Sequence, residues 1–194
     1  MRNKISWGSL ILASKSPRRC DLLKSLGIPF KKISIDINET TLKHKTPTEN
    51  ARCLAIKKAK KAMLMFPEDL ILAADTLLSF RQNVIGKPID YRDAIRILTM
   101  LSGEEHDVIT AIALFHKLNK LKEIGHVATR VSMKKLSKTE IVDYVKTGES
   151  LDKAGAYAIQ GKGSFLIKSY KGCYNNVVGL PTTLLKKKLE ILGF

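Results

Sequence analysis

Cysteine, histidine and aromatic side chains are scarce in this chain of 194 residues. The three cysteines, Cys20, Cys53 and Cys173, are odd in number, far apart and without a CxxC pair, which argues against a disulfide framework or a zinc knuckle. The four histidines include no i, i+4 pair of the zinc-binding kind. The cysteine usage therefore favours a reducing cytoplasm, and any metal would have to bind carboxylates and phosphates, which favours magnesium.

Long apolar runs are also missing. The longest unbroken runs, such as 10–13 and 70–74, fall far short of the roughly 20 residues that cross a bilayer. Residues 1–4 carry positive charge as a signal peptide would, but the apolar run after them is too short and leads into polar residues 14–16. We therefore expect no membrane contact, no export signal and a cytoplasmic location.

Acidic residues are few, with 18 Asp and Glu against 34 Lys and Arg, a net charge of +16. Such a field attracts polyanions of any kind, nucleic acid included. The lysines are scattered along the chain, however, and with only 6% aromatic residues no stacking platform for nucleic-acid bases is predicted. We expect a lysine-rich solvated surface that binds nucleic acid weakly, with strong salt dependence and no sequence preference.

The remaining composition is that of a globular protein. With 44% apolar residues the chain can bury a real core, and its length suits a single domain, residues 1–194, or two tightly joined lobes. Apolar patterns predict strands at 10–13, 70–80, 84–85, 107–115 and 127–133, and a further strand near Phe165. The last two long strands are predicted to pair across a turn at 118–122.

Capping residues predict the helices between these strands. The predicted starts and ends are Ser16-Pro17 to Gly27, the capping box Thr46–Glu49 to about Phe66, Asp90 to Gly103, the capping box Ser137–Glu140 to Gly148, and a final helix after Pro181. Residues 152–163 are rich in glycine, which indicates a loop whose backbone closely approaches another group. Strands mixed with helices and hairpins predict an α/β or α+β fold around one mixed sheet.

Two arginines, Arg18 and Arg19, fall in the first turn of the predicted helix after Ser14. The N-terminus of a helix already carries positive partial charge, so two cations there are unfavourable unless an anion binds. Free backbone N–H groups and two guanidinium groups would together form a phosphate cradle. The alternative is that both arginines are simply solvated on a basic protein.

Asp75 follows the apolar run 70–74 of a predicted strand, where a buried carboxylate is costly without a partner such as a metal or a bound water. A charge at a strand end that faces solvent is the alternative. Glu39 lies in a polar segment and is a weaker candidate for a second carboxylate, since magnesium is commonly held by one or two carboxylates together with substrate phosphates.

Two lysines are candidate partners for anions. Lys58 lies on the apolar stripe of its predicted helix, with Leu54 and Ala62 one turn away on either side. It either meets an anionic group inside the protein or extends its ammonium to the surface. Lys87, between Gly86 and Pro88, is a rigid lysine that either meets a phosphate or is an ordinary loop charge.

Taken in order, these motifs resemble the Maf family of nucleotide pyrophosphatases at family spacing over nearly the whole chain. The matching motifs are Leu12-Ala13-Ser14-Lys15-Ser16-Pro17-Arg18-Arg19, Ala74-Asp75-Thr76, Gly86-Lys87-Pro88, Leu101-Ser102-Gly103, Asp152-Lys153-Ala154-Gly155-Ala156-Tyr157, Ile159-Gln160-Gly161 and Val178-Gly179-Leu180-Pro181. The resemblance implies a Maf/HAM1 (ITPase)-like mixed sheet with flanking helices and two lobes around a central cleft. It further implies magnesium-dependent hydrolysis of nucleoside triphosphates to monophosphate and pyrophosphate, with manganese as a possible substitute, usually by a homodimer.

The resemblance also implies roles for single residues. Asp75 matches the catalytic carboxylate and, with Glu39, the metal site. The positions that match phosphate ligands are Ser14, Arg19, Lys58 and Lys87, with Lys153 as a less certain addition. We expect Asp75 to activate or orient a water that attacks the α-phosphorus, either as a base or as a metal ligand, while the cations screen the triphosphate.

Three positions follow the division of the family by substrate. They read Arg18, Thr76 and Gln160 here, like the branch that hydrolyses dTTP and UTP, whereas the branch resembling 7-methyl-GTP pyrophosphatases tends to carry Trp, Gln and Glu. Departures from the family pattern are Ala158, where glycine is frequent, and an extension through Ser9. The alternatives are a pyrophosphatase of the same fold for 7-methyl-GTP or a purine nucleotide, and a non-enzymatic role in septum inhibition or nucleic-acid binding.

Overall fold

A seven-stranded mixed sheet forms the backbone of the computed structural model, which describes residues 7–194. The predicted signal-like charge at residues 1–4 lies outside the described residues. The strand order is β2-β1-β3-β5-β6-β7, with β4 paired to β3; β1 runs parallel to β2 and β3, and the other pairs are antiparallel. The strands are β1 (Leu10–Ala13), β2 (Phe30–Ile33), β3 (Leu70–Phe80), β4 (Asn83–Ile85), β5 (Glu105–His116), β6 (Leu121–Met133) and β7 (Ile167–Lys171).

Five of the six α-helices in residues 7–194, all except Tyr174–Val178, begin where the capping residues predict. The helices are α1 (Pro17–Lys24), α2 (Pro47–Met65), α3 (Tyr91–Leu101), α4 (Lys138–Lys146), α5 (Tyr174–Val178) and α6 (Thr182–Leu192), with short 3-10 helices η1 (Ala154–Ala156) and η2 (Gly161–Leu166). Ser16 and Asp90 each accept a hydrogen bond from the backbone three residues on, and both predicted capping boxes form. None of the helices in residues 7–194 combines the length and the apolar character needed to span a membrane.

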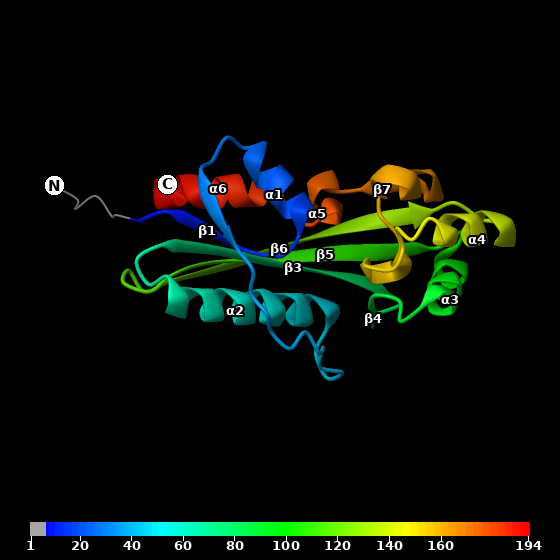
Figure 1. The fold of residues 1–194 in the computed structure, drawn as a ribbon, viewed down its shortest axis with the longest axis horizontal. Helices are drawn as coiled ribbons and strands as arrows, with labels where there is room; N and C mark the ends of the chain where they lie inside the picture. The colour runs from blue at the N-terminus through cyan, green and yellow to red at the C-terminus, as the bar shows by residue number, and fades with distance from the viewer. Residues whose placement is uncertain (1–6) are drawn as a thin grey trace.

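Helices cover both faces of the sheet around β1 and β3 (Figure 1). Ile71 and Ala73 of β3 pack in the core beneath α2, whereas Leu70, Leu72 and Ala74 face the opposite core with α1 and α6. Because both faces of β3 are buried, its sequence is an apolar run and not an alternating pattern.

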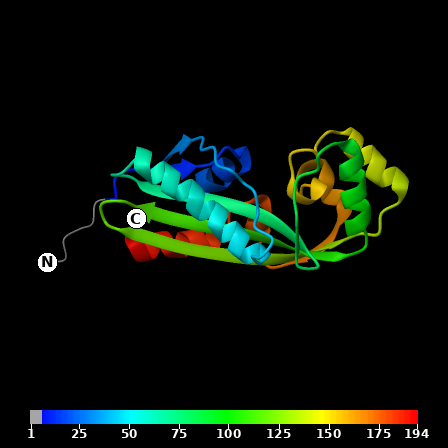
Figure 2. The same cartoon turned by 90° about the horizontal axis from the view of Figure 1, so that it is seen from below.

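The far ends of β3, β5 and β6 extend into a second lobe, built with α3, α4, η1 and η2 (Figure 2). Leu78, Val108 and Val131 of these strands pack in its core against Leu98 of α3 and Ile141 of α4. The two lobes therefore share long strands, and the predicted two-lobed mixed α/β fold is confirmed.

Several predicted boundaries were wrong. The sequence patterns did not predict β2 or α5, and β6 begins at Leu121, so the hairpin turn is shorter than the predicted 118–122. Phe165 lies in η2, and the strand after it begins at Ile167. Residues 30–33 and the first half of β6 are half exposed and lack a clear apolar alternation, so their strand conformation depends on the neighbouring strands.

Candidate active site

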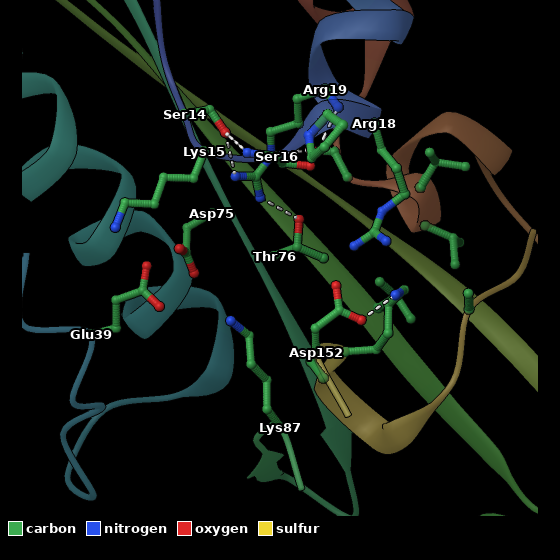
Figure 3. Close-up of a pocket in the computed structure, with 18 of the residues that line it drawn as sticks. Ser14, Lys15, Ser16, Arg18, Arg19, Glu39, Asp75, Thr76, Lys87 and Asp152 are labelled. Carbon is green, nitrogen blue, oxygen red and sulfur yellow. Dashed lines mark hydrogen bonds and ion pairs between the residues drawn. The ribbon is translucent and has the colours of Figure 1, made fainter. Parts of the chain in front are cut away.

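A cleft of about 620 Å³ lies where the two lobes meet, within the size range of small-molecule sites. Every site residue predicted from the sequence lines it: Ser14, Arg18, Arg19, Glu39, Lys58, Asp75, Thr76, Lys87, Lys153 and Gln160. Figure 3 shows those of these side chains that it labels around the same space; they come from the end of β1, the coil between β2 and α2, α1, β3 and the loop that follows β4. Sequence patterns assigned no role to four further lining residues, Lys15, Asp36, Asp152 and Tyr157.

Lys58 joins two carboxylates at the floor of the cleft. Its Nζ lies 2.6 Å from Oδ1 of Asp75 and 2.7 Å from Oε1 of Glu39, and both Lys58 and Asp75 are buried. The inward alternative for Lys58 is therefore confirmed. Glu39, the weaker candidate in the sequence, lies in the coil between β2 and α2 and reaches the site through this ion pair.

The two carboxylates have different environments. Burial raises the pKa of Asp75 above its ordinary value, although the charges of Lys58 and Arg19 oppose this effect. Partial burial acts in the same direction on Glu39, but the hydrogen bond and charge of Lys58, with help from Lys87, leave the pKa of Glu39 lowered. Asp75 is thus the better proton acceptor of the pair.

Arg19 is fixed by three acceptors on different segments. Its Nε donates to the carbonyl of Gly179 at 2.8 Å, one terminal nitrogen donates to Oγ of Ser14 at 3.3 Å, and the other donates to Oγ1 of Thr76 at 3.0 Å. Burial lowers the pKa of the Arg19 guanidinium, and Asp75 counteracts this shift. These bonds use three of its five N–H groups, so Arg19 organises the cleft as well as carrying charge there.

Arg18 and Lys87 project into the cleft from opposite sides. Figure 3 shows the guanidinium of Arg18 directed towards the side of Asp152, and the ammonium of Lys87 extending below Asp75. The backbone carbonyl of Gly86 accepts a hydrogen bond from the N–H of Gly155 at 3.0 Å, which joins the Lys87 loop to η1. These two cations stand at the opening where a polyanion would enter.

Lys153 has protein partners within its own loop. Its Nζ is paired with the carboxylate of Asp152 and donates to the carbonyl of Glu149 at 3.2 Å. Its role as a phosphate ligand therefore stays a prediction, and such a role would require the ammonium to leave Asp152.

The glycine-rich loop that carries Gln160 is held by Glu149. The Glu149 carboxylate accepts from the N–H of Gly163 at 2.8 Å, from the N–H of Lys162 at 3.3 Å and from the Tyr144 hydroxyl at 3.0 Å. A Cβ at Gly163 would lie 2.4 Å from the carbonyl oxygen of Ala158, so the backbone can close on itself only with glycine there. The predicted close approach is real, although at Gly163 the neighbour is the loop itself.

The cleft between the two lobes is lined by arginine, lysine and two carboxylates, and the mixed α/β fold that encloses it is also the architecture of Ham1 proteins. Two solved Ham1 proteins share this fold. The protein from Staphylococcus aureus has a TM-score of 0.55 at 17% identity over 94% of this chain and 98% of that chain, and the protein from Coxiella burnetii has a TM-score of 0.51 at 19% identity over 95% and 98%.

Within that architecture the chain belongs to the Maf family, since residues 9–192 match the family model described as Maf-like protein. Two curated relatives match this chain over nearly their full lengths. A protein of Pelotomaculum thermopropionicum is 42% identical over 95% of this chain and 97% of its own, and one of Ruminiclostridium cellulolyticum is 43% identical over 95% and 96%. Both are named dTTP/UTP pyrophosphatase.

Proposed function

We propose that this protein hydrolyses dTTP and UTP to the nucleoside monophosphate and pyrophosphate, as part of the upkeep of nucleotide pools. The observation that carries the proposal is a single cleft that joins a buried, lysine-paired carboxylate, Asp75, to the three positions Arg18, Thr76 and Gln160. Relatives above 40% identity named dTTP/UTP pyrophosphatase support this substrate class.

In the proposed reaction, a water attacks the α-phosphorus, the bond between the α-phosphorus and the bridging oxygen breaks, and pyrophosphate leaves. Asp75 accepts the proton of the attacking water, for which its raised pKa is suited. Arg18, Arg19 and Lys87 stabilise the negative charge of the triphosphate, and such preorganised charges are the main source of catalysis in phosphoryl transfer.

The family resemblance implies a magnesium ion, with manganese as a substitute, and the residues present fit it. Asp75 and Glu39 supply hard oxygen donors that already converge on one cation, the ammonium of Lys58. In residues 7–194 no three metal-ligating side chains form a cluster, so the protein would provide these two carboxylates beside the substrate phosphates, a typical magnesium arrangement. When bound, the ion would neutralise charge on the phosphates.

The proposal is tested by assaying a panel of triphosphates, dTTP, UTP, CTP, ITP, GTP and 7-methyl-GTP, with separate detection of pyrophosphate and orthophosphate. We expect pyrophosphate as the first product and the highest kcat/KM with dTTP and UTP. Chelation by EDTA should abolish turnover, and added magnesium should restore it. Orthophosphate as the first product would reject the reaction, and a preference for 7-methyl-GTP or ITP would favour the alternative substrate class.

The proposal includes a cytoplasmic homodimer without sequence-specific binding to nucleic acid. Light scattering after size exclusion measures the oligomeric state, and a monomer would contradict it. If the protein acts by a non-enzymatic role in septum formation, its cellular effect should survive Asp75→Asn; the proposed activity predicts that the effect is lost.

A further inference from the structure

A chain of buried hydroxyl and amide groups leads from the core of the sheet to the cleft. Thr76 of β3 and Thr110 of β5 are directly opposed in the antiparallel register, and their Oγ1 atoms are 2.9 Å apart. Thr110 is fully buried, and Asn176 of α5, also fully buried, lies behind it. Only Thr76 of these three residues lines the cleft.

The side-chain amide of Asn176 has a hydrogen-bond partner for its oxygen and two for its nitrogen, and these partners fix its orientation. Its Oδ1 accepts from the backbone N–H of Thr110 at 3.2 Å, and its Nδ2 donates to the carbonyl of Val108 at 2.8 Å and to Oγ1 of Thr129 at 3.0 Å. A flipped amide would place two donors against the N–H of Thr110. The position of α5 on the sheet is therefore fixed, and with it the backbone carbonyl of Asn176.

That carbonyl determines where the hydroxyl protons point. Oγ1 of Thr110 is 2.8 Å from the carbonyl oxygen of Asn176, which can only accept, so Thr110 donates its single proton there. Thr110 can then only accept from Thr76. The Thr76 proton is consequently directed into the core, and Oγ1 of Thr76 also accepts from Arg19 at 3.0 Å. What Thr76 presents to the cleft is an acceptor lone pair.

We infer that Thr110 and Asn176 determine substrate specificity from the core, because they fix Thr76 as a hydrogen-bond acceptor that requires a donor on the nucleoside. Thr110 is a positioning residue, since it acts only through Thr76. The inference rests on the proposed function for the nature of the substrate. A phosphate oxygen offers no donor when ionised, so Thr76 does not bind the triphosphate.

The nucleoside donors that dTTP and UTP share are the N3–H of the base and the 3′-hydroxyl of the sugar; the 2′-hydroxyl is present only in UTP. Cytosine has an acceptor in place of the N3–H donor, and a 3′-fluoro sugar has no donor at that carbon. CTP and 3′-fluoro-dTTP therefore distinguish the two donors. If the N3–H faces Thr76, substitution of Thr110 should change only the ratio of kcat/KM for UTP to that for CTP. If the 3′-hydroxyl faces Thr76, it should change only the ratio for dTTP to 3′-fluoro-dTTP.

The first test measures binding without turnover. Calorimetry with α,β-methylene-UTP and with inorganic tripolyphosphate compares the parent protein, Thr76→Val and Thr76→Ser. Because Thr76 also accepts from Arg19, Thr76→Val can weaken both ligands through the phosphates. We expect it to weaken the nucleotide analogue by about tenfold more than tripolyphosphate, the usual loss for one unpaired polar group, and Thr76→Ser to stay close to the parent. Equal weakening of the two ligands by Thr76→Val would overturn the inference, as would unchanged binding of the nucleotide analogue.

The second test removes the acceptor that holds the Thr76 hydroxyl proton in the core. Thr110→Val has the same shape but cannot accept, whereas Thr110→Ser keeps the hydroxyl as a matched control. We expect Thr110→Val to reduce the preference in kcat/KM for UTP over CTP, or for dTTP over 3′-fluoro-dTTP, by about tenfold, and Thr110→Ser to keep it. An equal loss on all substrates, or no change in either ratio, would overturn the inference. If Thr110→Val fails to fold, the same two ratios are measured with Thr110→Cys, whose sulfur is a much weaker acceptor than the hydroxyl.

Failure of the inference is distinguishable from failure of the proposed function. The parent protein alone tests whether dTTP and UTP are hydrolysed, and the calorimetric comparison requires no hydrolysis. An active parent whose Thr110 variants keep both substrate ratios would reject only the positioning role.

Discussion

At the scale of single residues, the cleft depends on one lysine that forms ion pairs with two carboxylates. Lys58 is almost fully buried, and a buried ammonium without an anionic partner would be costly. Asp75 and Glu39 offset this cost, and Lys58 in turn keeps the two carboxylates close together in spite of their mutual repulsion. The three side chains are therefore interdependent, and the loss of Lys58 would raise the pKa of both carboxylates.

Asp75→Asn keeps the shape of the side chain but removes the proton acceptor and the charge. We expect kcat for UTP to fall at least about a hundredfold, as is typical for the loss of a positioned acid or base. Asp107→Asn is a suitable control, because Asp107 pairs with Arg130 away from the lining of the cleft. Turnover of Asp75→Asn at the parental rate would place the proton acceptor elsewhere.

Gln160→Glu tests how the base is recognised. A primary amide can donate one hydrogen bond and accept another, which matches the adjacent N–H and carbonyl of uracil or thymine, whereas guanine presents two donors that suit a carboxylate. We expect kcat/KM on dTTP and UTP to fall by an amount equivalent to roughly 1–3 kcal/mol, and relative activity on guanine nucleotides to rise. Gln82→Glu, in the exposed β3–β4 turn, is the charge-matched control.

If Gln160→Glu leaves kcat/KM unchanged for both UTP and 7-methyl-GTP, Gln160 does not contact the base. Because Arg18 and Thr76 belong to the same group of positions, a full change of substrate would require their substitution as well.

At the scale of elements, the segment after α4 holds the loop that presents Gln160. Glu149 accepts three hydrogen bonds, two from the backbone of η2 and one from Tyr144, whose hydroxyl also accepts from the N–H of Ala158 at 3.2 Å. Burial raises the pKa of Tyr144, and the nearby Glu149 adds to this shift, so the phenol stays protonated and can donate. The loop is therefore fixed to the second lobe while its tip faces the cleft.

Glu149→Gln should loosen this loop, because an amide has one acceptor oxygen in place of two and no charge. Hydrogen bonds to a charged group contribute about 1.5–3 kcal/mol each, so we expect KM for UTP to rise about tenfold or more. Affinity for tripolyphosphate, which has no base, should not change. Glu104→Gln, an exposed position paired with Arg81, is the control; a parallel loss of tripolyphosphate affinity would show a general distortion of the cleft.

At the scale of the whole molecule, the core of the second lobe contains a neutral histidine. His106 is 2% exposed, and its Nε2 lies 2.6 Å from the hydroxyl of Tyr157, which itself lines the cleft. Burial lowers the pKa of His106 to about 4. The unfolded chain, in which histidine has a pKa of roughly 6.5, binds this proton more readily than the folded protein does.

The free energy of unfolding should therefore fall as the pH decreases from about 6.5 to about 4, because protons bind preferentially to the unfolded state. At about 1.4 kcal/mol per pKa unit, His106 accounts for a loss of about 3 kcal/mol. Denaturant unfolding at a series of pH values measures the free energy of unfolding as a function of pH. This free energy should change less with pH for His106→Gln than for the parent and for the exposed control His44→Gln. An equal pH dependence in all three proteins would mean that folding does not lower the pKa of His106.

The chain sequence by itself determined the local elements and the membership of the site. Caps and apolar periodicity depend on residues a few positions apart, so the starts of α1, α2, α3 and α4 and the buried strand β3 follow from local chemistry alone. Ten of the residues that line the cleft were predicted, most of them because motifs such as Ser14–Arg19 and Ala74–Thr76 carry the family resemblance. These two motifs lie at the start of α1 and within β3, elements whose positions are predictable.

Only the tertiary structure decided which of these groups meet. The ion pairs of Lys58 with Asp75 and Glu39, and the bonds that turn the Thr76 proton inward, join segments distant in the chain, so no local pattern predicts them. The elements missed in the sequence, β2 and α5, have the same cause: β2 exists because β1 offers a hydrogen-bonding edge, and Asn176 joins α5 to β5 and β6. Local free energies select the elements, whereas the direction of a proton or the partner of a charge depends on how those elements pack.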